Sequence, residues 1–156
     1  MNAPVSIAAL KAQVGAEIGV SRWFTISQGL IDAYADVSED HQYIHVDPDR
    51  AAEAGFGGTI AHGFLTVSLL SAMAYEVVPL SSDVKMSVNY GFDHLRFLSP
   101  VPSGSRVRGR FVLNSIEERA PGEVTLIWAV TVEIEGADRP ALVANWITRR
   151  YLEPSV

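Results

Sequence analysis

The pattern of apolar residues along the chain changes its period near residue 84. Beyond that point apolar and polar residues alternate, which is typical of strands that bury one face of a sheet. The clearest run consists of Val124, Leu126, Trp128, Val130, Val132 and Ile134. Similar runs, separated by Pro and Gly turns, cover residues 84–90, 94–98, 106–116 and 142–151. The second half of the chain therefore predicts about five antiparallel strands.

The first half of the chain carries mainly helical signals. Residues 1–17 suggest a short helix or an arm, and residues 20–25, rich in aromatic and β-branched types, predict a first strand. Ser27 is a favourable N-cap for a helix over residues 28–37. The apolar stripe of that helix contains Leu30, Ile31, Tyr34 and Val37.

Two more helices are expected before the strands begin. Asp47 and Pro48 predict the N-cap and first position of a short helix that stops near Gly55. Residues 61–75 are apolar on nearly all sides, so we expect that helix in the middle of the domain. One strand, a helical block and then a run of strands predict an α+β fold. We expect a single domain over residues 1–156, with an antiparallel sheet and one very apolar helix packed on it.

Composition narrows the classes of function. Only 19% of the residues are charged, which favours burial of part of the surface in a second copy of the chain. The formal net charge of −6 argues against a nucleic-acid binder. Residues 1–10 lack the pattern of a signal peptide, and the apolar segment 59–73 is too short to span a membrane. The absence of cysteine fits a reducing cytoplasm.

Residues 38–47 hold two imidazoles and three carboxylates, and Asp40 and His45 are the pair of interest. Their spacing of five turns through roughly 140° on a helix and puts them on opposite faces of a strand. Only a chain that folds back on itself would bring them together. A carboxylate beside an imidazole suits acid–base chemistry near neutral pH. The alternative, on spacing alone, is a solvated polar loop with His45 packed against the following helix.

The same segment contains a pattern that resembles a zinc protease, with His41 and His45 four residues apart. That chemistry needs a glutamate where Gln42 stands, because an amide is not a general base. We therefore expect no metal site here.

A second group of residues covers 57–64, where a glycine turn enters the apolar helix. The first N–H groups of a helix have no partner within it and lie at the positive end of its dipole, so they could polarise a carbonyl oxygen. Gly63 would let a substrate approach this backbone closely. The alternative is that the glycine only allows tight helix packing. His62 is expected to be a hydrogen-bonded structural histidine rather than a catalyst.

Together, these motifs carry a resemblance to a known family. The Asp40-x-x-x-x-His45 segment, followed by Gly-Gly-Thr-Ile-Ala-His-Gly-Phe-Leu at residues 57–65 and then by strands, resembles the MaoC-like, (R)-specific enoyl-CoA hydratases. The amino-acid sequence of residues 40–47 is most similar to that of the branch that includes nodulation protein N. Residues 89–91 and 96–102 also match that branch, so the resemblance covers roughly residues 24–110.

The resemblance implies a hot-dog fold, in which the sheet wraps around the central helix, and a dimer or dimer-based oligomer with the acyl tunnel near the subunit interface. It also implies that Asp40 and His45 hold the water that adds to a trans-2-enoyl thioester, while the Gly63 N–H binds the thioester carbonyl. The substrate would be an acyl-CoA or an acyl-carrier-protein thioester, with no metal or redox cofactor. The chain departs from the commoner Gly-Asp-x-Asn-Pro-x-His form at Glu39, Gln42 and Tyr43.

Two other functions stay open at this stage. A hot-dog thioesterase would use the same helix start without needing the Asp40/His45 pair. A non-catalytic subunit of a heteromeric dehydratase, or an acyl-binding protein, would need neither residue. The candidate cations for CoA phosphates are Arg106, Arg108, Arg110, Arg149 and Arg150, although charges that alternate along a strand are typical of its solvent face.

Overall fold

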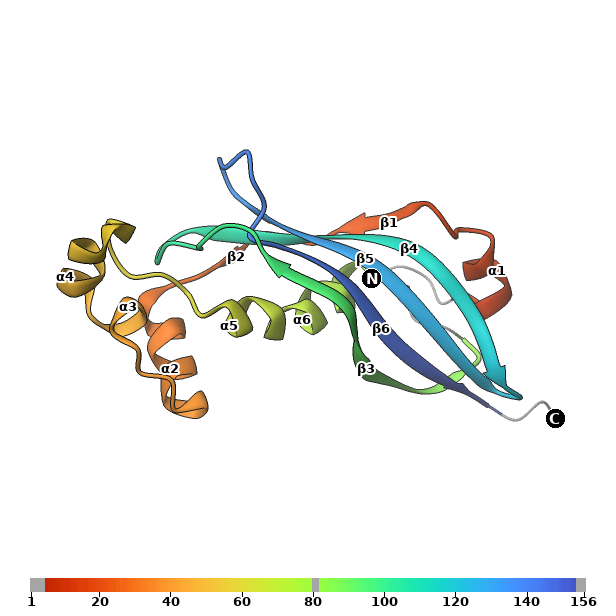
Figure 1. The fold of residues 1–156 in the computed structure, drawn as a ribbon. Coiled ribbons are helices and arrows are strands. Elements are labelled where there is room, and N and C mark those ends of the chain that lie inside the picture. Colours follow the sequence, from red (N-terminus) through yellow and green to blue (C-terminus); the bar gives the residue numbers. More distant parts are fainter. Residues whose placement is uncertain (1–4, 80–81, 154–156) are drawn as a thin grey trace.

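The computed structural model describes residues 5–79 and 82–153, and a long, curved antiparallel sheet dominates it (Figure 1). The sheet has six strands: β1 (Glu17–Val20), β2 (Phe24–Thr25), β3 (Val84–Phe97), β4 (Arg106–Ala120), β5 (Glu123–Ile134) and β6 (Leu142–Leu152). Their order is β1-β4-β5-β6-β3, with β2 also paired to β4. The α+β arrangement predicted from the sequence is confirmed.

Strand β5 shows why alternation was informative. Its apolar residues at every second position are buried and form the centre of the core. Trp128 is the largest of them, and its indole Nε1–H donates to Thr148 Oγ1 on the neighbouring β6 at 2.9 Å. The polar end of the ring is therefore satisfied inside the core, as a buried tryptophan requires.

Two strand predictions were wrong in their boundaries. The two runs predicted over residues 84–90 and 94–98 form the single strand β3, which ends at Phe97, because irregularities in the pairing with β6 absorb the changes of phase. The expected strand over residues 20–25 is divided into β1 and β2. Between them, Ser21 leaves the regular ladder and bonds Gly109 through both its backbone and its hydroxyl.

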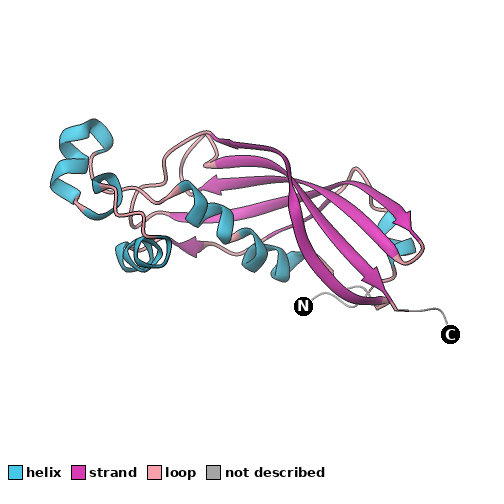
Figure 2. Cartoon of the chain, turned by 60° about the horizontal axis from the view of Figure 1, so that its bottom comes forward, coloured by secondary structure: helices cyan, strands magenta, loops and turns pink. Residues whose placement is uncertain are grey.

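The central helix lies across the concave face of the sheet in two segments, α5 (Gly63–Ser68) and α6 (Leu70–Val77) (Figure 2). Leu69 joins them with a nearly helical backbone, φ −74° and ψ −13°. Leu65, Leu70 and Met73 are buried. The helix was expected to lie buried in the middle of the domain, and within the single chain this holds only for the side that faces the sheet. The sheet covers only one side, and the other side leaves Tyr75 79% exposed.

The remaining helices are α1 (Ile7–Lys11), α2 (Gln28–Ser38), α3 (Tyr43–Val46) and α4 (Pro48–Ala51), which continues into the π-helical turn η1 (Ala52–Phe56). The two predicted N-caps are confirmed. The Ser27 hydroxyl accepts from the Leu30 N–H, and the Asp47 carboxylate accepts from the Arg50 N–H. The predicted stripe on α2 is only partly right, because Ile31 is buried but Val37 is 80% exposed.

Helices α2, α3 and α4 gather at one end of the sheet and project beyond it (Figure 1). The start of α5 points toward the same end, so the two motifs singled out in the sequence converge there. None of the helices in the described residues is long and apolar enough to cross a membrane.

Candidate active site

The segment that carries Asp40 begins with a sharp helix end. Glu39 closes α2 in the left-handed conformation, with φ +58° and ψ +19°. This backbone costs a non-glycine residue roughly 1–2 kcal/mol, which explains why the commoner form of the motif has glycine at this position. The turn then directs Asp40 back toward the sheet, and its Oδ1 accepts from the Gln42 N–H at 3.3 Å.

His45 lies in the one-turn helix α3, not in an irregular loop as the sequence suggested. Its side chain is buried, and its Nδ1 lies 2.7 Å from the carbonyl oxygen of Ile60. Because a carbonyl only accepts, Nδ1 carries the proton and Nε2 keeps a free lone pair. Burial lowers the pKa of His45, and so does His62, against the opposing effects of the Ile60 carbonyl and Asp40. The ring is therefore a neutral base at pH 7.

Ile60 connects this histidine to the body of the protein. Its N–H donates to the Ile44 carbonyl at 3.0 Å, its own carbonyl accepts from His45, and it forms an isolated β-bridge with Pro102. The position of the imidazole is thus fixed by backbone groups rather than by long side chains. Backbone hydrogen bonds of this kind hold a ring in one orientation.

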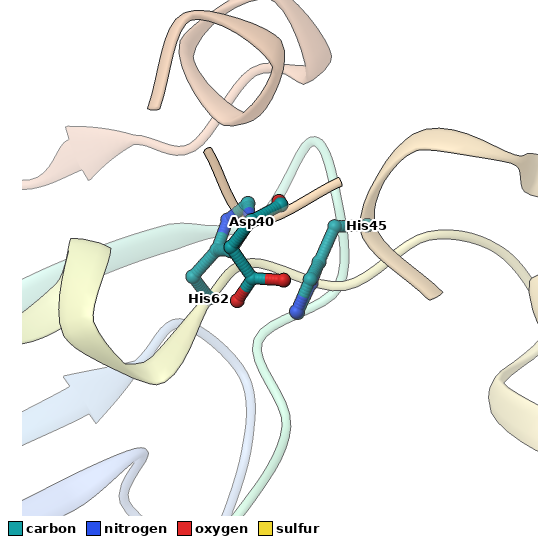
Figure 3. Close-up of side chains that lie close together, drawn as sticks. All are labelled: Asp40, His45 and His62. Carbon is teal, nitrogen blue, oxygen red and sulfur yellow. The ribbon is translucent and has the colours of Figure 1, made fainter. Parts of the chain in front are cut away.

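The structure brings Asp40 and His45 together, as the spacing argument required. A carboxylate oxygen of Asp40 and ring nitrogens of His45 and His62 lie within 4.8 Å of one another. Figure 3 shows the Asp40 carboxylate pointing into the space beside the His45 ring. Asp40 is exposed whereas both histidines are buried. The separation suits a shared water between carboxylate and imidazole.

His62 contributes more to this arrangement than the sequence indicated. Its Nε2–H donates to the backbone carbonyl of Asp40 at 2.9 Å, which confirms the predicted hydrogen-bonded structural role. Its ring also stacks on that of His45, with centroids 3.7 Å apart and planes inclined by 25° (Figure 3). One residue therefore holds both members of the pair. The only sequence signal for this was the position of His62 directly before Gly63.

Gln28 was missed entirely by sequence reasoning. Its side-chain amide donates to the His45 carbonyl at 2.8 Å and accepts from the Thr59 hydroxyl at 2.5 Å. It thus joins α2 to both motifs. Nothing in the sequence distinguishes this glutamine from a solvent-exposed helical residue, because its partners come from distant parts of the chain.

The cluster of Asp40, His45 and His62 contains ligand types that bind metals, but its geometry does not fit a single ion. A metal must lie in the plane of each imidazole, about 2.0–2.1 Å from the nitrogen. Two rings that stack 3.7 Å apart and nearly parallel have planes that meet far beyond that distance. The His62 Nε2 is also engaged by Asp40. The arrangement suits proton transfer better than metal binding.

A cavity of about 400 Å³ adjoins His45, and its wall also includes Gly63 and Phe97. Gly63 is the first residue of α5, so its N–H has no acceptor within the helix. A Cβ at this position would lie 2.8 Å from Cε1 of the Phe97 ring. Only glycine leaves room here, and the helix start therefore presents bare backbone to the cavity.

The arginines considered for CoA phosphates are mostly committed elsewhere. Arg106, Arg108 and Arg110 form ion pairs with glutamates of the strands beside them. Arg149 pairs with Glu123, and Arg150 is buried. The ion pairs of the first four arginines are typical of the surface of a sheet rather than of a phosphate-binding site.

Comparison with known proteins gives a consistent result. A family model described as the MaoC like domain matches residues 10–133. Nodulation protein N from Rhizobium leguminosarum bv. viciae is 52% identical, over 97% of this chain and 94% of that protein. The 3-hydroxyacyl-thioester dehydratase Z of Mycobacterium tuberculosis is 45% identical, over 92% and 95% of the two chains.

Among solved structures, the (R)-hydratase from Aeromonas caviae involved in PHA biosynthesis superposes with a TM-score of 0.67 at 27% identity, covering 86% of this chain and 94% of that one. This similarity confirms the predicted hot-dog fold. The sequence match and the fold lead to one conclusion: the chain belongs to the MaoC-like family, whose relatives include hydratases and dehydratases.

Proposed function

We propose that the protein is an (R)-specific enoyl-thioester hydratase and dehydratase, which interconverts trans-2-enoyl and (R)-3-hydroxyacyl thioesters of CoA or acyl carrier protein. The observation that carries this proposal is the meeting of the Asp40 carboxylate with a neutral, buried His45. The same His45 shares a cavity wall with the helix start at Gly63. An acid–base pair beside a free N–H donor is what water addition to a thioester needs.

In the proposed reaction, His45 Nε2 removes a proton from water as the water oxygen bonds to the β-carbon. The electron pair of the double bond moves toward the thioester carbonyl, whose oxygen gains charge and accepts a hydrogen bond from the Gly63 N–H. Such a donor is worth about 3–4 kcal/mol in other enzymes. Asp40 shares the water and assists the transfer of the proton that His45 took from it to the α-carbon on the same face, which leaves His45 neutral again. The steps need no metal and no redox cofactor.

We also propose that the active form is a homodimer or an assembly of dimers, built through β3. This strand ends the sheet and exposes apolar side chains along its length, including Met86, Tyr90 and Phe92. A long apolar edge strand normally pairs with another chain. The open side of the central helix, which exposes Phe64 and Tyr75, offers a second apolar surface. A cytoplasmic location stays a prediction from the sequence.

The first prediction concerns the acid–base pair of Asp40 and His45. Asp40→Asn and His45→Gln are each expected to lower hydration of an enoyl-CoA by ~10²–10⁴, the usual range for a positioned acid–base group. The double variant should fall little further, because the two residues act on one water. The readout is chromatographic quantification of the 3-hydroxyacyl product, with circular dichroism as the control for folding.

Two results would contradict this assignment. Additive losses in the double variant would mean that Asp40 and His45 do not share a step. Release of free CoA by the wild-type protein, detected with a thiol reagent and without hydroxyacyl product, would instead identify a thioesterase.

The second prediction concerns the helix start. Gly63→Val should abolish turnover, because the side chain would occupy the place of the thioester carbonyl. The helix should survive, since valine costs it less than ~1 kcal/mol in propensity, and the half-exposed Phe97 ring can move aside. The double variant Gly63→Val with Phe97→Ala removes that ring contact. Recovery of activity in the double variant would show that displaced Phe97, not a blocked carbonyl, caused the loss.

The third prediction follows from the lowered pKa of His45. Hydration requires the neutral ring, so kcat/KM should be level above pH 6.5, the ordinary pKa of histidine, and fall only at lower pH. Below pH 6.5 the unfolded chain takes up this proton before the folded one, so the free energy of unfolding should also fall as the pH drops. His45→Gln should lack that part of the stability change, whereas His41→Gln, at an exposed position, should retain it.

The fourth prediction concerns assembly. Light scattering at micromolar concentration should give at least twice the chain mass of 16.9 kDa. Met86→Glu places a charge on the edge strand and should shift the protein toward monomer. Val37→Glu is the matched control, because Val37 is also exposed but lies on α2. A wild-type protein that is purely monomeric would overturn the proposed dimer.

A further inference from the structure

His62 is a buried titratable residue that has no part in the proposed reaction steps. It is only 3% exposed and occupies the N-cap position of α5. A residue at this position normally uses its side chain to bind the first N–H groups of the helix, but the His62 side chain makes no such bond. The ring is therefore free to make contacts outside the helix, and the start of α5 is left without a side-chain cap.

The edge of the His62 ring is used on one side only. Its Nε2–H donates to the Asp40 carbonyl at 2.9 Å, so the neutral ring has its lone pair on Nδ1. No group among the described residues bonds that Nδ1, although the atom is buried. A buried nitrogen without a partner is uncommon in folded proteins and requires an explanation.

The explanation is that the same ring holds two other groups. Its face stacks on the His45 ring with centroids 3.7 Å apart, which is direct van der Waals contact and leaves no room for water between the rings (Figure 3). A half-turn of the His62 ring would move Nδ1 to other surroundings, but it would also remove Nε2 from the Asp40 carbonyl. The unpaired Nδ1 follows from keeping both contacts.

The stack acts on the charge of the base. It excludes water from one face of the His45 ring, and water is what stabilises an imidazolium. Burial is the largest cause of the lowered pKa of His45, and His62 lowers that pKa further. Among the described residues, the titratable groups that face the two rings are Asp40, which raises the pKa of His45, and Tyr34 of α2, whose ring centroid lies 5.0 Å from that of His62.

We propose that His62 is a positioning residue with two separable tasks in the proposed reaction. The face of its ring keeps the His45 imidazole unprotonated, so that His45 can act as a base, and its Nε2–H fixes the turn that carries the Asp40 carboxylate. In this scheme His62 touches neither the water nor the thioester. The inference rests on the proposed function for the use of the base, but the contact with His45 can be tested without turnover.

Two substitutions separate the two tasks. His62→Gln keeps an N–H donor within reach of the Asp40 carbonyl and removes the aromatic face. His62→Phe keeps an aromatic face beside His45 and removes the donor. His94→Gln is the matched control, because it makes the same substitution at an exposed histidine of β3.

The first measurement follows the four histidine rings by ¹H–¹⁵N NMR as the pH is lowered. The pKa of His45 should be higher in His62→Gln than in the wild type, because water then reaches the uncovered face of the ring. In His62→Phe it should stay closer to the wild-type value, because burial is the largest cause of the shift and the face is still covered. His94→Gln should leave the pKa of His45 unchanged.

The second measurement is the pH profile of enoyl-CoA hydration. His62→Gln should lower kcat/KM more at pH 6 than at pH 8, because a larger share of His45 is then protonated at pH 6. His62→Phe should lower kcat by ~10² at both pH values, the effect expected when a reacting group is misplaced by about 1 Å. A merely structural role would lower activity by the same factor at every pH in both variants.

The outcomes separate this inference from the proposed reaction. Hydration by the wild type, with an unmoved His45 pKa in His62→Gln, overturns the first task and leaves the reaction intact. A raised His45 pKa in that variant, in a protein that hydrates no enoyl thioester, supports the contact and overturns the reaction. Full kcat in His62→Phe overturns the second task.

Circular dichroism shows whether each variant is folded, and the wild-type NMR spectrum decides the question if neither variant folds. The proposal requires the proton of the neutral His62 ring on Nε2. A proton on Nδ1 instead would exclude the bond to the Asp40 carbonyl and overturn the proposal.

Discussion

The close packing of the central helix on the sheet is the constraint on which the rest of the structure depends. Gly109 of β4 makes it possible, because a Cβ there would lie 3.0 Å from Met73 Sδ and 2.8 Å from the Phe111 ring. Met73 and Phe111 are fully buried and have no room to move. With its sheet-facing side fixed in this way, the helix presents its N-terminus at one end of the sheet. Its opposite side is not covered within the single chain.

The geometry of the candidate site follows from that fixed helix start. His62 immediately precedes α5, donates to the Asp40 carbonyl and stacks on His45. Ile60, two residues earlier, binds His45 Nδ1 and bridges to Pro102. A shift of the helix would therefore displace the Asp40 segment, the base and the Gly63 N–H together. This coupling gives a projecting group of short helices the rigidity that acid–base chemistry requires.

Burial adjusts one member of the acid–base pair and not the other. At His45 it lowers the pKa and keeps a base neutral, which supports the proposed reaction. Asp40 is exposed, although it lies beside the buried imidazole. The Asp40 and His45 motif is local in the sequence, whereas the burial of His45 also depends on Ile60 and His62, which lie outside that motif.

The sequence by itself determined the elements with strong local signals. These are the alternating strand β5, the helix caps at Ser27 and Asp47, the motif that contains Asp40 and His45, and the helix that begins at Gly63. These depend on neighbours within a few residues. Only the tertiary structure decided that residues 84–97 form one irregular strand, that the sheet covers the central helix on one side, and that Gln28 and His62 hold the site. Those features depend on groups 17 to 22 residues apart or on a neighbouring strand, and no local pattern records such contacts.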